Sequence, residues 1–228
     1  MQVADSNEFT VRDVVMRVLG EETPRVDSRA HARTEILIHS INVFARRGLE
    51  RTTVQHLLDA AGISRRTFYK YFRNKVDVLE SIYQILVENM ILRFRNETTQ
   101  SGSLSEVIRH TCNIYFDYHL SLGPIIRLMM EEARRTDSIL APHRQRAYQA
   151  VSLVMQSELE RVSGRRLDLL VHRALIWNLE NLSLYLLNET DCSPQQVNHC
   201  KQVMVGIAEA VLADGPHHQL LGEQRQVT

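Results

Sequence analysis

The chain has 228 residues, of which 44% are hydrophobic and 24% are charged, with 27 Lys or Arg balanced by 27 Asp or Glu. A net charge of zero would normally argue against a nucleic-acid partner, but the charge is unevenly divided. Residues 25–75 hold eleven basic and four acidic side chains, a net of +7, which leaves −7 on the rest of the chain. This division predicts a phosphate-binding segment attached to an acidic body with another task.

Residues 1–30 form an N-terminal extension that is acidic near its start and has no apolar core run, so a secretory signal peptide is excluded. A short amphipathic helix over residues 8–20 is indicated by Phe9, Val11, Val14, Val15, Val18 and Leu19. One interpretation is a helix or arm that packs on its own domain. The alternative interpretation is that Arg25, Arg29 and Arg33 contact the DNA backbone or lie in its minor groove.

Three short helices are predicted next, over residues 31–75. The first runs from about Ala32 to Arg47 and is ended by Gly48; its inner stripe is Leu37, Ser40, Ile41, Phe44 and Ala45. The second has an apolar stripe at Val54, Leu57, Leu58 and Ala61. Thr52 and Gln55 are expected to form its capping box, and Gly62 to end it.

The third short helix begins after Ser64, whose hydroxyl can cap it. Its periodicity turns Phe68, Tyr71 and Phe72 to one side and turns the polar group of Arg65, Arg66, Tyr69, Lys70 and Arg73 to the other. Guanidinium groups can bind guanine O6 and N7, and Lys and Tyr can reach phosphates. A charged helix face is often only solvated. Here the helix-turn-helix spacing, the interleaved aromatic residues and the local positive charge favour DNA binding.

Helices are predicted through the remaining body, so the expected fold class is all-α, with no alternating strand pattern and no repeat. Asn74 can cap a long helix from Lys75 to about Arg95. Further helices are expected to open at Ser103, Pro124, Pro142, about Arg166 and Ser193, the last running to about Ala213. The predicted domains are residues 31–75 for DNA binding, 76–215 for a helical body, and 216–228 for a tail.

The motifs Thr-Thr-Val at residues 52–54, Ala-Ala-Gly-Ile-Ser at residues 60–64 and Thr-Phe-Tyr-Lys-Tyr-Phe-x-x-Lys at residues 67–75 resemble the TetR family of transcriptional regulators. The match covers roughly residues 33–80, whereas the body resembles the family only in length and helical pattern. The resemblance implies a homodimeric, ligand-responsive regulator, usually a repressor, with double-stranded DNA as its partner and with effector binding and dimerisation in residues 76–215. A cytoplasmic location is expected from the absence of a signal peptide.

The resemblance also implies which side chains contact DNA. The expected base and nearby backbone contacts are Arg65, Arg66, Tyr69 and Lys70, and the expected phosphate contacts are Thr53, Thr67, Tyr71 and Lys75. Leu58 departs from the small Ala common in the family, which suggests a wider gap between the two helices. Arg66 departs from the usual small residue or Pro, and we take it as a hypothesis that the operator contains guanine.

The helix from Leu175 to Leu187 is apolar on nearly every side, which requires cover from its own domain or from a second subunit. In the family the last two helices of the body pair with those of a dimer mate. Two recognition helices would then lie about 34 Å apart on a palindromic operator. Core packing inside one monomer is the alternative interpretation.

A pocket for a small apolar or aromatic effector is expected mainly from the resemblance. Its candidate lining residues are Phe116, His119, Met129, Met130, Met155, Trp177, Asn181 and Tyr185. A few polar groups among apolar ones suit such a site, although Met and aromatic stripes at helical spacing also build ordinary cores. His119, Asn178 and Asn181 can equally be satisfied polar groups of a core or interface. The effector is not identified.

No cofactor, metal or membrane association is expected. Cys112, Cys192 and Cys200 give an odd count that favours unpaired thiols, with a redox pair of the last two as a weaker alternative. His199, Cys200, His217 and His218 lack a four-ligand zinc spacing. Because no phosphate loop, nucleophile elbow or zincin motif occurs, the chain is not expected to be an enzyme. The remaining alternative is a DNA-binding dimer with no effector and a structural or protein-recruiting role.

Overall fold

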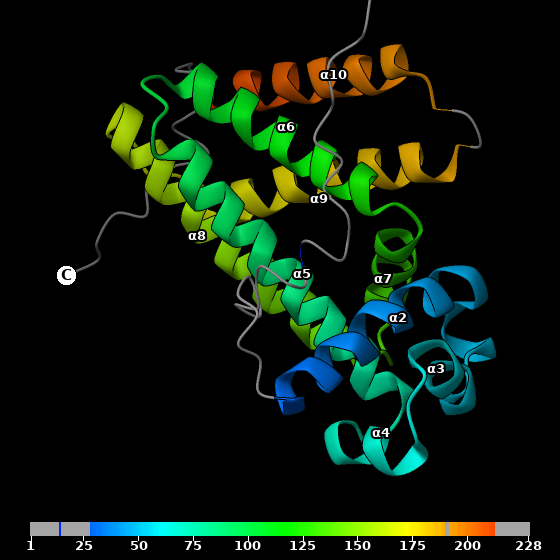
Figure 1. Ribbon diagram of the computed structural model, residues 1–228. Coiled ribbons are helices and arrows are strands. Elements are labelled where there is room, and N and C mark those ends of the chain that lie inside the picture. Colours follow the sequence, from blue (N-terminus) through cyan, green and yellow to red (C-terminus); the bar gives the residue numbers. More distant parts are fainter. Residues whose placement is uncertain (1–13, 15–27, 190–191, 213–228) are drawn as a thin grey trace, which may run out of the picture. The chain divides into compact units, whose positions relative to one another are not determined.

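The computed structural model describes residue 14 and residues 28–189 and 192–212 (Figure 1). Within this part of the chain all regular structure is α-helical, which confirms the all-α prediction. The helices are α2 (Ser28–Arg51), α3 (Val54–Ala61), α4 (Arg65–Tyr71), α5 (Lys75–Thr98), α6 (Leu104–Leu122), α7 (Pro124–Arg134), α8 (Ala141–Ser163), α9 (Leu169–Asn188) and α10 (Pro194–Leu212). Apart from Val14, the helix predicted over residues 8–20 lies outside the described residues, as do Arg25 and the tail 216–228.

The chain divides into two compact units. The first holds the residues up to Asn89 together with Ser121–His143, and the second holds Met90–Leu120 and the residues from Arg144 onward. The predicted boundary at residues 75 and 76 differs from this division in two ways. α5 is one continuous helix that carries residues of both units, and α7 packs on α2 within the first unit. The apolar side of α7 explains its place, because Ile125, Ile126, Met129 and Met130 are all buried.

The first unit has its core between α2 and the two helices of the predicted motif. Ile36, Leu37 and Phe44 of α2 are fully buried, as are Leu57 of α3 and Phe68 of α4. α2 begins four residues earlier than the predicted Ala32. The regular helix breaks where expected, because Gly48 has φ 70, a left-handed conformation that favours glycine.

The cap of α3 lies one residue later than predicted. Thr53, not Thr52, is the N-cap: its hydroxyl accepts from the amide of His56 at 3.3 Å, and its own amide donates to His56 Nδ1 at 3.2 Å. Thr52 is buried and donates its hydroxyl to the Gly48 carbonyl at 2.6 Å. The predicted box of Thr52 and Gln55 is therefore wrong. Both threonines have a hydroxyl that could cap the helix. Thr53 does so because the Thr52 hydroxyl is already bonded to the Gly48 carbonyl near the end of α2.

Three other helix ends follow the predicted signals, and one start is displaced. Gly62 ends α3 with φ 64, and Ser64 caps α4 by accepting from the Thr67 amide at 3.1 Å. Asn74 caps α5 through bonds from the amides of residues 76 and 77, at 2.9 and 3.0 Å. α9 starts at Leu169 and not at Arg166, because the Asp168 carboxylate caps it. Side-chain caps thus set where these helices begin.

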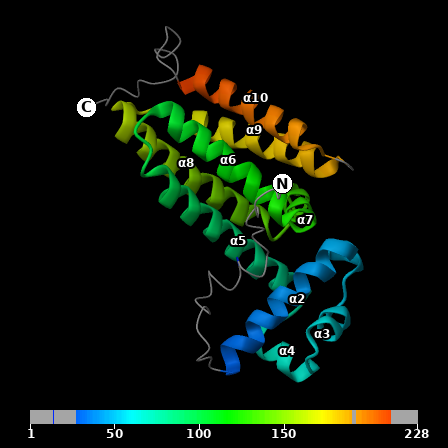
Figure 2. The same cartoon turned by 45° about the horizontal axis from the view of Figure 1, so that its top comes forward.

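The second unit combines the later part of α5 with α6, α8, α9 and α10. α9 and α10 run alongside each other in opposite directions (Figures 1 and 2). Ser193 caps α10: its hydroxyl accepts from the Gln196 amide at 3.2 Å, and its own amide donates to Gln196 Oε1 at 2.8 Å. The Ser193-Pro194-Gln195-Gln196 signal is therefore confirmed. The buried residues of both helices point into this unit, among them Leu175, Leu179, Met204 and Ala208.

Candidate nucleic-acid interface and apolar cavity

α4 has one packed side and one exposed side. Phe68 and Phe72 are buried, and their rings lie 5.9 Å apart. The exposed residues of the helix are Arg65, Arg66 and Lys70, together with Tyr69, which is 50% exposed; Arg73, just after the helix, is also exposed. Tyr71 is half-buried, with the Lys70 ammonium 5.3 Å from its ring centre. The packed aromatic rings hold a short helix firmly enough to present its cationic side to a partner.

Side-chain hydrogen bonds orient this exposed surface. Arg65 Nη2 donates to Gln55 Oε1 at 3.1 Å, so the guanidinium is held against α3. The hydroxyls of Ser64 and Thr67 lie 2.9 Å apart at the first turn of α4. Free amides at a helix start favour an anion, and both hydroxyls can add to such a contact. The structure therefore brings Arg65, Arg66 and Thr67 together near one helix end.

Lys75 has a different role from the phosphate contact expected for it. Its ammonium donates to the carbonyls of Leu49 at 2.7 Å, Glu50 at 3.0 Å and Thr52 at 2.7 Å. An ammonium has three hydrogens, and all three are used in these bonds. Lys75 thus ties the start of α5 to the end of α2 and retains no donor for a phosphate. Nothing in the sequence indicated this, because the acceptors are backbone atoms.

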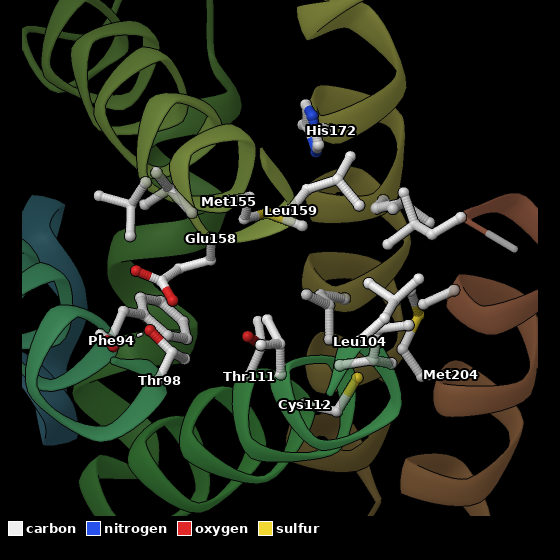
Figure 3. A pocket seen from close by; sticks show the side chains of 18 residues that line it. Phe94, Thr98, Leu104, Thr111, Cys112, Met155, Glu158, Leu159, His172 and Met204 are labelled. Carbon is white, nitrogen blue, oxygen red and sulfur yellow. Dashed lines mark hydrogen bonds between the residues drawn. The ribbon is translucent and has the colours of Figure 1, made fainter. Parts of the chain in front are cut away.

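The second unit contains an apolar cavity between α5, α6, α8, α9 and α10 (Figure 3). It encloses about 600 Å³ of empty space, counting the gaps between atoms and its open side. Its wall is mainly aliphatic, with Leu104, Leu159, Leu175 and Met204 among its side chains, and Phe94 supplies an aromatic ring. The wall has the apolar character of a small-molecule site, with few polar groups among aliphatic ones.

Only Met155 of the eight predicted pocket residues lines this cavity. Phe116, Met129 and Met130 are buried core residues, and the latter two belong to the first unit. His119 is buried with its Nδ1 2.8 Å from the Ser183 hydroxyl and its ring 4.0 Å from that of Tyr115. Trp177, Asn181 and Tyr185 lie on an exposed side of α9. Helical spacing identified residues of apolar helices but not which side of each helix meets the cavity.

The few polar groups in the cavity wall were missed by the sequence interpretation. Glu158 is buried, and its Oε2 accepts from Arg161 Nε at 2.9 Å and Nη2 at 2.7 Å. Arg161 also donates to the carbonyls of Thr98 and Ser101. Figure 3 shows the Glu158 carboxylate turned toward Phe94 and Thr98, with His172 on another part of the wall. A charged or imidazole residue inside an otherwise apolar helical stripe was the available signal.

The cysteines give little support to redox chemistry. Cys112 lines the cavity, and burial raises the pKa of its thiol to about 12. Burial, with a smaller contribution from Cys192, also raises the pKa of Cys200. A thiol held protonated is a poor nucleophile. The redox alternative for Cys192 and Cys200 therefore gains no support from their surroundings.

An exposed apolar surface lies on the second unit, and we call it the α9/α10 face. It consists of Leu170 (59% exposed), Trp177 (42%) and Tyr185 (50%) on α9, and Val203 (41%) and Ile207 (38%) on α10. The residues recur at helical spacing on each helix, and the helices are adjacent. Apolar side chains exposed on two neighbouring helices make this face a candidate protein interaction surface.

The described part of the chain has neither a metal-binding cluster nor a membrane-spanning helix. Residues 28–189 and 192–212 contain no group of three or more His, Cys, Asp or Glu side chains placed to hold a metal ion. Across the same residues, no helix combines the length and hydropathy that crossing a bilayer requires. His217 and His218, considered above as metal ligands, lie outside the described residues.

Comparison with known families finds one match, over residues 36–82, to the family described as bacterial regulatory proteins, tetR family. Over 157 residues the chain is 26% identical to the transcriptional activator FasR of Mycolicibacterium smegmatis, an alignment covering 68% of this chain and 67% of FasR. It is 36% identical over 70 residues to the transcriptional repressor KstR2 of Rhodococcus jostii, covering 31% of this chain and 34% of KstR2. Both relatives are transcriptional regulators.

Solved structures with the same fold span most of the chain. The fatty acid degradation regulator FadR from Bacillus halodurans has a TM-score of 0.63 and 20% identity, covering 75% of this chain and 97% of FadR. SCO4454, a TetR-family transcriptional regulator from Streptomyces coelicolor, has a TM-score of 0.69 and 13% identity, covering 90% of this chain and 98% of the other. At these identities the likeness is one of fold alone.

Proposed function

We propose that the chain is a DNA-binding transcriptional regulator of the TetR family, and that it is a homodimer that reads a palindromic operator and is released by a small apolar effector. The family match over residues 36–82 and the similarity to FasR support this proposal. The observation that carries the DNA part is the exposed cationic side of α4, anchored by Phe68 and Phe72. The proposed contacts are Thr53, Arg65, Arg66, Thr67, Tyr69, Lys70 and Tyr71.

Their chemistry divides into base reading and phosphate binding. Arg65 and Arg66 carry planar guanidinium groups that can bind guanine in the major groove, and Gln55 preorients the first of them. Thr53 and Thr67 lie at helix starts, where a phosphate is favoured. Lys70, Tyr69 and Tyr71 can bind phosphates of the DNA backbone beside the bases that the arginines contact. Lys75 is left out of this set because its ammonium is already used.

The α9/α10 face supports the homodimer. Its five apolar side chains and the small Gly206 and Ala210, which are also exposed on α10, suit close packing against a second copy. Trp177→Arg should convert the dimer to a monomer and weaken operator binding, because one subunit reads only half a palindrome. Leu153→Arg is the matched control, since Leu153 is 51% exposed on α8 outside this face. Sedimentation at micromolar concentration measures both variants, and a wild-type monomer would contradict the proposal.

The cavity supports control by an effector. Phe94 and Thr98 of its wall belong to α5, the same continuous helix that begins at Lys75 among the DNA-binding elements. An effector that shifts α5 would change how the two recognition helices fit an operator. Binding of effector and DNA must then weaken one another by the same factor. We propose repression as the outcome, following KstR2; the longer match to the activator FasR makes activation the alternative to test.

Selection of bound sequences from a random duplex pool, at two salt concentrations, tests the DNA part directly. We expect a palindrome with guanine at the positions read by Arg65 and Arg66. Weak binding without a motif, falling steeply with salt, would contradict sequence-specific reading and favour the structural or protein-recruiting alternative. A reporter with the selected operator overlapping a promoter then separates repression, seen as lower expression, from activation.

A further inference from the structure

His172 stands in the cavity wall on α9 with its side chain fully buried. Its Nε2 lies 2.9 Å from Gln156 Oε1. The Gln156 amide is oriented by two other bonds: its Nε2 donates to the Arg165 carbonyl at 3.2 Å, and its Oε1 accepts from the Leu167 amide at 3.0 Å. Because Gln156 therefore presents an acceptor to the imidazole, the hydrogen must be on His172 Nε2.

The other ring nitrogen is consequently an acceptor. In neutral histidine one nitrogen donates and the other carries a lone pair, so Nδ1 of His172 has a lone pair to share. Within the described residues, this atom is buried and has no hydrogen-bond partner. Burial lowers the pKa of His172 to about 4, which keeps the ring neutral at physiological pH. A buried acceptor left unpaired is costly, and a ligand that donates to it would remove that cost.

We propose that the effector is a mainly apolar molecule with a neutral O–H or N–H group, and that this group donates a hydrogen bond to His172 Nδ1. The inference rests on the proposed effector site and names the chemistry that the site selects. The aliphatic wall around His172, including Leu159 and Leu175, suits the apolar part of the molecule. An anionic head group is disfavoured, because a neutral Nδ1 has no hydrogen to give it and the Glu158 carboxylate lies in the same wall.

Isothermal titration of the full chain with four probes, each built on a straight ten-carbon chain, tests this selection. The probes are 1-decanol and decanamide, which donate, 1-methoxydecane, which cannot donate, and decanoate, which is anionic. We expect both donors to bind about tenfold more tightly than the ether, the ratio that one neutral hydrogen bond to a buried acceptor supplies. His172→Leu should reduce the ratio to about one, whereas Met155→Leu, an apolar exchange in the same wall, should preserve it.

The outcomes separate this inference from the proposed function. Equal binding of alcohol, amide and ether to the wild-type chain would overturn the inference and leave the effector site standing, as expected if water already pairs with Nδ1. Tighter binding of decanoate than of the alcohol and amide at pH 7.5 would also overturn it, since the site would then select an anion and not a neutral donor. Failure of every probe to bind would count against the effector site itself. Circular dichroism checks whether His172→Leu is folded. If it is not, the comparison of the four probes on the wild-type chain still tests the inference.

Discussion

Lys75 illustrates how a single residue can matter to DNA binding without touching DNA. Its three bonds to the carbonyls of Leu49, Glu50 and Thr52 link the chain before α3 to the start of α5. Hydrogen bonds to a charged donor are stronger than neutral ones. Lys70, by contrast, is exposed and its ammonium lies over the Tyr71 ring. Two lysines five residues apart therefore have separable effects on stability and on binding.

Lys75→Met should lower the free energy of unfolding by about 1–3 kcal/mol, because the variant leaves three carbonyls without their charged donor. Lys70→Met should leave stability within about 0.5 kcal/mol of wild type and instead weaken operator binding with a shallower salt dependence. Urea unfolding and binding titrations at several salt concentrations measure the two effects. A Lys75→Met protein as stable as wild type would refute the assigned role.

The sequence predicted well which side chains of α4 are exposed. It predicted less well which buried side chains line the cavity. Arg65, Arg66, Tyr69 and Lys70 were expected on one side of a short helix, and they are exposed there. The cavity depends instead on which sides of five helices meet. Trp177 and His172 lie on the same helix, yet one is exposed and the other lines the cavity. Composition and periodicity describe both equally well.

At the scale of elements, the helix boundaries were predictable where a cap residue had no neighbouring rival. Gly62, Ser64, Asn74 and Ser193 all act where the sequence indicated. The first cap of the motif was displaced from Thr52 to Thr53, because two adjacent threonines could both serve. The grouping of α7 with the DNA-binding helices was not predictable, since it depends on an apolar side that any neighbouring helix could cover.

Gly62 offers a test of how strictly the turn between α3 and α4 is set. Its φ is 64, and a Cβ added there would meet no atom within 4 Å, so the cost of a substitution comes from the backbone alone. Gly62→Ala should reduce the unfolding free energy by about 1–2 kcal/mol. Gly62→Asn should cost less, because Asn tolerates the left-handed conformation. Thermal unfolding monitored by circular dichroism gives both values, and equal losses would show that side-chain contacts, not backbone strain, decide.

The whole molecule should lose stability in mild acid because of two buried histidines. Burial lowers the pKa of His119 to about 3 and that of His172 to about 4. An unfolded histidine has a pKa of about 6.5, so below that pH the unfolded chain binds protons that the folded chain does not. Stability is therefore complete above pH 6.5 and decreases as the pH falls toward 4. Each histidine should cost about 2 kcal/mol at pH 5.

Urea unfolding at pH 7.5 and pH 5.0 measures this loss. His119→Gln should remove roughly half of the difference between the two pH values, since glutamine does not titrate in this range. His199→Gln is the control, because His199 is exposed on α10. An unchanged pH dependence in His119→Gln would mean that the loss in acid arises elsewhere.

Coupling between effector binding and operator binding is a property of the whole molecule, because α5 carries residues of both units. If effector and operator bind one protein with opposed preferences, removing the effector site must abolish the response while sparing the DNA surface. Ala208 lines the cavity and is 5% exposed, so Ala208→Leu would fill part of that space. We expect 1-decanol binding to weaken at least about tenfold, operator affinity to stay within about twofold, and release from DNA to be lost. Ala150→Leu, which adds the same atoms on α8 outside the cavity, should keep all three properties. Operator affinity falling in parallel with probe binding in Ala208→Leu would show instead that the cavity residues support the DNA-bound state directly.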